Sequence, residues 1–158
     1  MPGKIPLKVS RTGSGALPVQ KAESKSTINI LSMAYNLAEE SLKQLKTDYV
    51  DILQIHNPQQ LPDPDDENSV YAGLKLAQKK GKVRFIGISL HKFTGAKSVL
   101  RSNIYDILQY PLPALSSRKE INLTKIAEKN NIGKITMKPL CSGPLTDIEL
   151  AFGFFVAV

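Results

Sequence analysis

The sequence predicts a parallel α/β fold, and three observations lead to that fold class. Short apolar runs alternate with longer stretches of helical periodicity along most of the 158 residues, which is typical of parallel strands joined by crossover helices. Two of the apolar runs end in a polar residue, one at His56 and the other at Ser89. The distance along the chain between them is about thirty residues, the length of one βαβ unit.

About five strands are expected. The first would be Ile5–Val9, which Pro6 interrupts, in a segment rich in Gly, Ser, Pro and Lys that otherwise indicates a loop. We therefore divide the chain into a loop-rich segment, residues 1–25, and a folded region, residues 26–158. The other expected strands cover residues 49–55, 83–88, 104–109 and 134–138.

Helices are expected where apolar residues recur at intervals of three and four. Two of them carry end signals: Gly81 suits the position after a helix, and Ser117 with Glu120 forms a capping box that opens one. The expected helices cover residues 27–45, 70–80, 94–101 and 148–158, with the capping box opening a further helix that closes at 130–133.

Composition narrows the class of protein. The length suits one domain with its own core, and no apolar run reaches the ~18 residues that a membrane helix needs. The formal charge of +7 comes from lysines scattered over helix faces and helix ends, which favours solvated helices over nucleic-acid binding. The single cysteine, Cys141, excludes an internal disulfide and suits the reducing cytoplasm.

Polar residues collect where the expected strands end, the edge at which parallel α/β folds and (β/α)₈ barrels bind ligands. His56 would polarise a carbonyl or shuttle a proton, or else cap the strand end through backbone bonds. Ser89 would bind an amide or a phosphate and Gln109 an amide group, or else both are ordinary strand-end residues. Lys138 would bind a phosphate or lie at the surface. His91 is the weaker of the two histidines and indicates a loop residue.

Other catalytic signatures do not occur in this sequence. It has no glycine-rich phosphate loop followed by Lys and Ser or Thr, and no Gly-x-Gly-x-x-Gly. No paired His/Cys spacing indicates zinc, so no metal ligands are predicted. Cys141 has no activating neighbour in the sequence and is expected to be inert.

Four stretches resemble the aldo-keto reductase family. Residues 41–51 followed by Gln54-Ile55-His56 are similar to the family segment that ends in its active-site histidine. Residues 81–89 are similar to the segment whose serine contacts the nicotinamide amide, and residues 106–110 to the strand whose glutamine does the same. Residues 137–140 are similar to a variant found in one branch, with Met137 where most members have an aromatic residue that stacks on the nicotinamide. Order and spacing agree as well as the residues.

The resemblance implies a NADP-dependent (β/α)₈ barrel that transfers a hydride to an aldehyde or ketone, using Asp, Tyr, Lys and His. Such barrels need about 250 residues, so the expected fold is a partial barrel of about five parallel strands. Leu90 stands where the family usually has asparagine. Carried over by residue, the catalytic positions are His56 and Lys8, and the cofactor-binding positions are Ser89, Gln109, Met137 and Lys138.

The implied function is an incomplete or inactive aldo-keto reductase. The strands that bring the family's Asp and Tyr are expected upstream of residue 1, and the segment that grips the adenosine phosphate after residue 158. Two alternatives are an enzyme completed by another chain and a non-catalytic binding or scaffold module. The expected partners are a nicotinamide cofactor, a small carbonyl substrate, and further copies of the chain that associate through open sheet edges.

Overall fold

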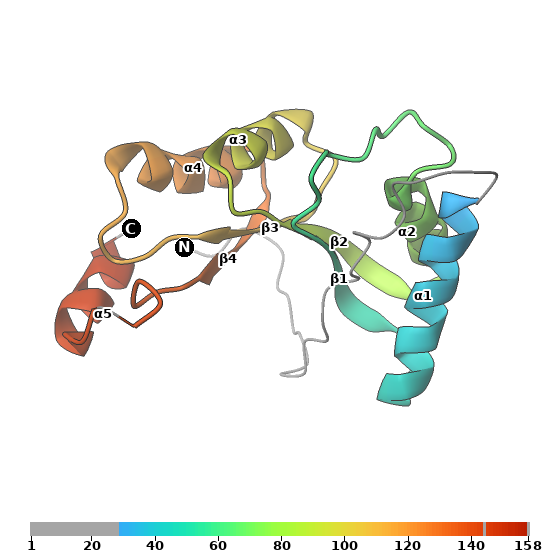
Figure 1. Cartoon of the computed structure of the whole chain (residues 1–158), viewed down its shortest axis with the longest axis horizontal. Helices are drawn as coiled ribbons and strands as arrows, with labels where there is room; N and C mark the ends of the chain where they lie inside the picture. Colours follow the sequence, from blue (N-terminus) through green and yellow to red (C-terminus); the bar gives the residue numbers. More distant parts are fainter. Residues whose placement is uncertain (1–28, 144, 158) are drawn as a thin grey trace. The chain divides into compact units, whose positions relative to one another are not determined.

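Strands and helices alternate along the described part of the chain (Figure 1). The structure, a computed structural model, describes residues 29–143 and 145–157, so segment 1–25 and the expected strand Ile5–Val9 lie outside the described residues. The elements are α1 (Ile30–Leu45), β1 (Val50–His56), α2 (Val70–Lys79), β2 (Val83–Ser89), α3 (Phe93–Ser102), β3 (Ile107–Pro111), α4 (Arg118–Lys129), β4 (Gly133–Met137) and α5 (Ile148–Ala157). The predicted α/β class with parallel strands and crossover helices is confirmed, with four strands in the described residues.

The described residues form two compact units that divide between Ser89 and Leu90. We call them the amino-terminal unit and the carboxy-terminal unit. The first contains α1, β1, α2 and β2, and the second contains α3, β3, α4, β4 and α5.

In the amino-terminal unit, β1 and β2 pair in parallel with a register that places apolar residues opposite each other. Leu53 faces Ile86 and Ile55 faces Ile88, and all four side chains are at most 4% exposed. Because side chains alternate along a strand, these four lie on one face of the pair. The helices α1 and α2 lie side by side next to the strands (Figure 1), and their buried residues include Ala38, Leu42, Leu74 and Ala77.

In the carboxy-terminal unit, β3 and β4 also pair in parallel, with Ile107 opposite Gly133 and Pro111 opposite Met137. Both α3 and α4 lie on the same side of this pair (Figure 1). The two helices are linked where the Asn130 side-chain amide donates to the Leu100 carbonyl. The last helix, α5, leaves three large apolar side chains more than half exposed: Ile148, Leu150 and Phe152.

The start of β3 corrects the sequence-based prediction. A strand was expected over 104–109, but β3 runs over Ile107–Pro111. Asn103 caps α3 with a left-handed φ of 53°, and the parallel ladder with β4 begins only at Ile107. The Asp106 carbonyl accepts from the Gly133 amide at 2.8 Å, just before that ladder. The β-branched and aromatic residues before position 107 therefore lead into the strand without belonging to it.

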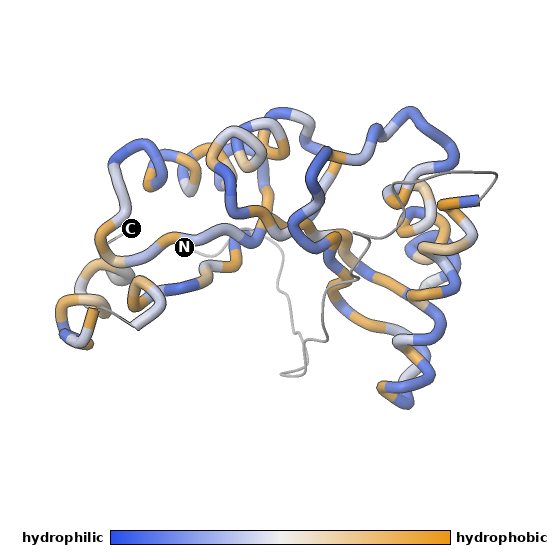
Figure 2. Tube along the Cα trace, viewed as in Figure 1, coloured by the Kyte–Doolittle hydropathy of each residue, from blue (hydrophilic) through white to orange (hydrophobic). Residues whose placement is uncertain are grey.

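Local end signals account for most other boundaries. Ser117 and Glu120 form the predicted capping box, and Gly81 has a φ of 72° directly after the C-cap of α2, as predicted. Ser69 caps α2 by accepting from the Ala72 amide at 3.1 Å. The connection between β1 and α2 is mostly hydrophilic along its length (Figure 2). In residues 29–143 and 145–157, no helix is both long enough and apolar enough to cross a membrane.

Close contact between α1 and α2 depends on Gly73. A Cβ added there would lie 2.6 Å from the Leu31 carbonyl oxygen and 2.7 Å from the Ala34 Cβ. We expect Gly73→Ala to lower the free energy of unfolding by about 1–3 kcal/mol, because the helices must separate. Gly95→Ala is the matched control, since its Cβ would meet only Leu90 side-chain atoms at 3.4 Å or more. Urea unfolding of both variants measures the difference, and equal midpoints would contradict the prediction.

Candidate functional site

The ends of β1 and β2 bring a histidine and a serine together. His56 and Ser89 are the last residues of their strands and are direct register partners. His56 Nδ1 lies 2.9 Å from Ser89 Oγ, within hydrogen-bond distance. Ser89 is buried, with 3% of its surface exposed, whereas His56 is exposed. The pairing thus anchors the inner edge of the imidazole and leaves the rest of the ring accessible.

Asn57 completes this corner of the amino-terminal unit. Its backbone N–H donates to the Ser89 carbonyl at 2.8 Å and to Ser89 Oγ at 3.2 Å. Its φ of 38° is positive, in the left-handed region that asparagine tolerates better than most residues. The chain therefore turns away immediately after His56, and that turn is fastened to the strand that carries Ser89. Sequence reasoning missed Asn57, although an asparagine before a proline is a turn signal.

Gln54 is a second residue that sequence reasoning did not single out. It lies two positions before His56, so the two side chains are on the same face of β1. Its register partner is Gly87, which has no side chain to fill the space opposite. Gln54 Oε1 is buried and has no hydrogen-bond partner among the described residues. The sequence signal that could have found Gln54 is a polar side chain within an apolar strand. A buried amide oxygen requires a hydrogen-bond donor, such as water or a ligand.

The carboxy-terminal unit carries the other predicted cofactor residues. Gln109 Nε2 donates to Met137 Sδ at 3.9 Å, and both residues are half-buried. Met137 ends β4 as expected, but Gln109 is the third of five residues in β3 and does not end it. This corrects the predicted strand-end position, because the ladder with β4 continues past Gln109 to Pro111 opposite Met137. Lys138 follows β4 directly and is exposed, with a left-handed φ of 58°.

The Gln109 side chain is available to an amide-bearing ligand. Sulfur is a weak acceptor, so the bond to Met137 leaves most of the hydrogen-bonding capacity of the Gln109 amide for another planar amide. In the backbone, the amide of Leu90 donates to the Gln109 carbonyl at 2.9 Å.

Lys8, the predicted catalytic lysine, lies outside the described residues. Within the described ranges, no group of three or more His, Cys, Asp or Glu side chains is placed to hold a metal ion.

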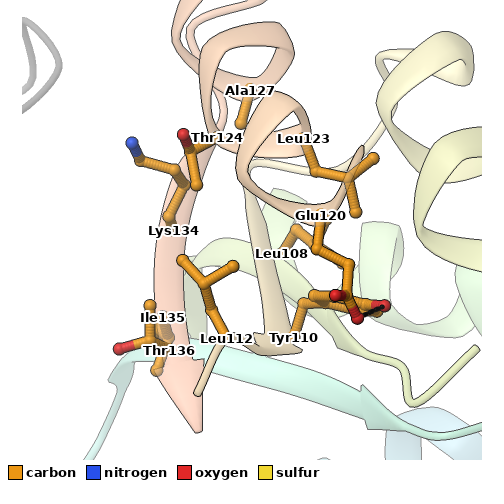
Figure 3. A pocket seen from close by; sticks show the side chains of 10 residues that line it. All are labelled: Leu108, Tyr110, Leu112, Glu120, Leu123, Thr124, Ala127, Lys134, Ile135 and Thr136. Atoms are coloured by element: carbon orange, nitrogen blue, oxygen red, sulfur yellow. Dashed lines mark hydrogen bonds between the residues drawn. The ribbon is translucent and has the colours of Figure 1, made fainter. Parts of the chain in front are cut away.

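A small cavity lies elsewhere in the carboxy-terminal unit, between α4 and the strands β3 and β4 (Figure 3). Its volume of about 30 Å³ is room for water and too little for a nicotinamide. The lining is mainly apolar, and Tyr110 with Glu120 closes one side, the phenol donating to the carboxylate at 3.4 Å. Burial, with a further contribution from Glu120, raises the pKa of Tyr110 above its ordinary value. This cavity is a packing gap and not the candidate site.

Comparison with known proteins identifies the family. The family described as the Aldo/keto reductase family matches residues 14–151, most of the chain. The chain is 30% identical over 108 residues to the aldo-keto reductase YhdN of Bacillus subtilis, which covers 68% of this chain and 32% of that protein. A second relative, the uncharacterized oxidoreductase YcsN of the same organism, is 44% identical over 54 residues, 34% of this chain and 17% of that protein. The chain thus spans a third or less of the length of these relatives.

Solved structures show the same fold. The chain matches the holo form of aldo-keto reductase AKR11C1 from Bacillus halodurans with a TM-score of 0.60 and 19% identity, over 82% of this chain and 42% of that chain. It matches a Bombyx mori aldo-keto reductase, solved in complex with NADP, with a TM-score of 0.53 and 23% identity, over 70% of this chain and 38% of that chain. Both likenesses support the partial-barrel architecture.

The raised pKa of Tyr110 predicts a pH dependence of stability. The neutral phenol is favoured in the folded state, so its contribution is present below the unfolded pKa of about 10 and is lost as the pH rises through the folded value. We expect the wild type to lose stability relative to Tyr110→Phe as the pH rises from about 9, one unit below that pKa, upwards through the folded value. Urea unfolding across this range tests it, with Tyr49→Phe at an exposed tyrosine as control. Parallel curves for wild type and Tyr110→Phe would contradict the prediction.

Proposed function

The chain belongs to the aldo/keto reductase family, and from that premise we propose that it supplies the carbonyl-polarising and nicotinamide-binding part of a NADP-dependent carbonyl reductase site. The observation that carries the proposal is the pairing of His56 with Ser89 at the ends of neighbouring parallel strands. This edge is where enzymes of the barrel class place their catalytic groups. The exposed imidazole supplies a hydrogen-bond donor for a carbonyl oxygen.

The cofactor residues of the proposal are Ser89, Gln109, Met137 and Lys138. Ser89 and Gln109 would hold the nicotinamide carboxamide, Met137 would pack against the ring, and Lys138 would face a phosphate. When bound, NADPH supplies the hydride, and the residues of this chain orient the carbonyl and the nicotinamide. Two hydrogen bonds, each worth ~1 kcal/mol net, are too few to repay the freedom that a dinucleotide loses on binding. We therefore infer that NADPH binds the isolated chain only weakly.

We further propose that the 158-residue chain by itself does not reduce carbonyls. Carbonyl reduction needs a proton donor at the carbonyl oxygen and a cofactor held in a near-attack pose. The family resemblance assigns the proton donor to a tyrosine, and two of the chain's tyrosines are committed elsewhere. Tyr35 donates to Glu39 at 2.6 Å, and Tyr110 donates to Glu120.

The half-buried Cys141 suits a reducing compartment, so we propose a cytoplasmic location for the protein.

The activity proposal is tested by NADPH consumption with a panel of aldehydes and quinones. We expect no turnover above the rate without protein, either for the wild type or for His56→Ala. Turnover that disappears in His56→Ala would overturn the proposed inactivity and make the chain a working reductase. Amide spectra of the ¹⁵N-labelled chain during a NADPH titration test the binding part. We expect shifts at the Ser89 amide and at the Gln109 side chain in the wild type, and a smaller Ser89 shift in Gln109→Ala. No shift at either group in the wild type would contradict the cofactor assignment.

A second role, as one part of a larger assembly, is favoured by the apolar surface of α5. Ile148, Leu150 and Phe152 are between 56% and 66% exposed, an arrangement more typical of an interface than of a monomer surface. The edges of a parallel sheet also offer unpaired backbone groups to another chain. We propose that copies of the chain associate through these surfaces.

Light scattering tests the proposed association. We expect the wild type to scatter as a species larger than one chain at high concentration, because apolar surface would be removed from water. The double variant Leu150→Glu/Phe152→Glu should shift the distribution towards the monomer. Arg101→Glu, at an exposed position on α3, is the charge-matched control. A wild type that stays monodisperse and monomeric would refute the association.

A further inference from the structure

We propose that Ser89 is a positioning residue that sets the tautomer of His56, with the single ring proton on Nε2. This goes beyond the cofactor contact assigned to Ser89 above. The tautomer follows from the hydrogen bonds of this corner alone, whereas its catalytic meaning rests on the proposed function.

A serine hydroxyl has one proton to donate and two lone pairs that accept. The Asn57 backbone N–H points at Ser89 Oγ from 3.2 Å, and this contact uses one lone pair. The remaining contact, 2.9 Å from Ser89 Oγ to His56 Nδ1, has two possible directions. Either the hydroxyl donates to a bare Nδ1, which leaves the ring proton on Nε2, or Nδ1–H donates to the hydroxyl.

Burial decides between the two directions. Ser89 is only 3% exposed, so water does not readily reach its hydroxyl. If Nδ1–H were the donor, Ser89 Oγ would accept twice and its own proton would need a third partner. No such acceptor for Ser89 exists among the described residues. A buried hydroxyl proton without a partner is costly, whereas donation to Nδ1 pairs every group at the corner.

The consequence is a hydrogen-bond donor at the exposed side of the ring. Nε2 has no partner among the described residues, and His56 is exposed at the strand end. A neutral imidazole with its proton on Nε2 can donate to a carbonyl oxygen without first becoming charged. The opposite tautomer would present a lone pair there and repel the same oxygen. Ser89 therefore acts on the carbonyl through His56.

The test reads the tautomer directly by long-range ¹H–¹⁵N correlation of the imidazole rings in the ¹⁵N-labelled full chain. Spectra are recorded where the ring shifts no longer change with pH, so that the imidazole is neutral. We expect the Nε2–H form of His56 to predominate in the native chain. In Ser89→Ala the tautomer ratio should move about fivefold towards the ratio in the urea-unfolded chain, the equivalent of one hydrogen bond.

Two controls show whether a change in the tautomer ratio is due to the Ser89 hydroxyl. Ser89→Thr keeps a hydroxyl and should restore the native ratio, and His91, the other histidine, should keep the same ratio in all variants. A predominant Nδ1–H form in the native chain would overturn the proposal, and this holds even if Ser89→Ala fails to fold. An unchanged ratio in a folded Ser89→Ala would overturn it as well. The tautomer measurement does not depend on turnover. It can therefore be made on a chain without reductase activity, and the tautomer proposal and the proposed function can each fail without the other.

Discussion

The register between β1 and β2 is the constraint on which the candidate site depends. It places Leu53 and Ile55 opposite Ile86 and Ile88, and these four buried residues form one apolar face. A slip by one residue would turn either strand's apolar set towards the other face. The same register brings His56 opposite Ser89, so burial on one face determines which polar groups meet at the strand ends. The site geometry is in this sense a product of core packing.

The turn after His56 fixes the point at which the chain leaves the sheet, and with it the position of the His56 side chain. Asn57 adopts a positive φ and returns two hydrogen bonds to Ser89, so the chain leaves the sheet at a defined point. Ser89 is buried while His56 is exposed. One hydroxyl is therefore hydrogen-bonded to both the turn and the ring. A functional side chain held by a rigid strand end and a buried partner is positioned more precisely than one on a free loop.

Membership of the aldo/keto reductase family gives this corner its chemical meaning. The family's reaction needs an oriented carbonyl, a held nicotinamide and a proton donor, and the described residues supply candidates for the first two. His56 and Ser89 belong to one compact unit, and Gln109 and Met137 to the other. The chain spans a third or less of the two relatives named above. The proposed role is accordingly that of one part of a reductase site.

Much of the fold and part of the site follow from the sequence alone. The alternation of apolar runs and helical periods determines the class and the order of the elements, because it reflects local geometry that each segment carries by itself. The capping box at Ser117 and the glycine at 81 mark helix ends for the same reason. The abrupt change from apolar to polar residues at His56 and Ser89 marks the ends of two strands.

The tertiary structure alone decided the features that depend on pairing between distant residues. β3 begins at Ile107 and not at residue 104 because its ladder with β4 starts there. The first pair of that ladder joins Ile107 to Gly133, 26 positions later in the chain (133 − 107). The hydrogen bond between His56 and Ser89 depends on a register between residues 33 positions apart. The burial of the Gln54 oxygen, which has no hydrogen-bond partner among the described residues, and its place opposite Gly87 also depend on this register. Local sequence patterns carry periodicity and end signals, but a hydrogen-bond partner is chosen by the strand that packs alongside.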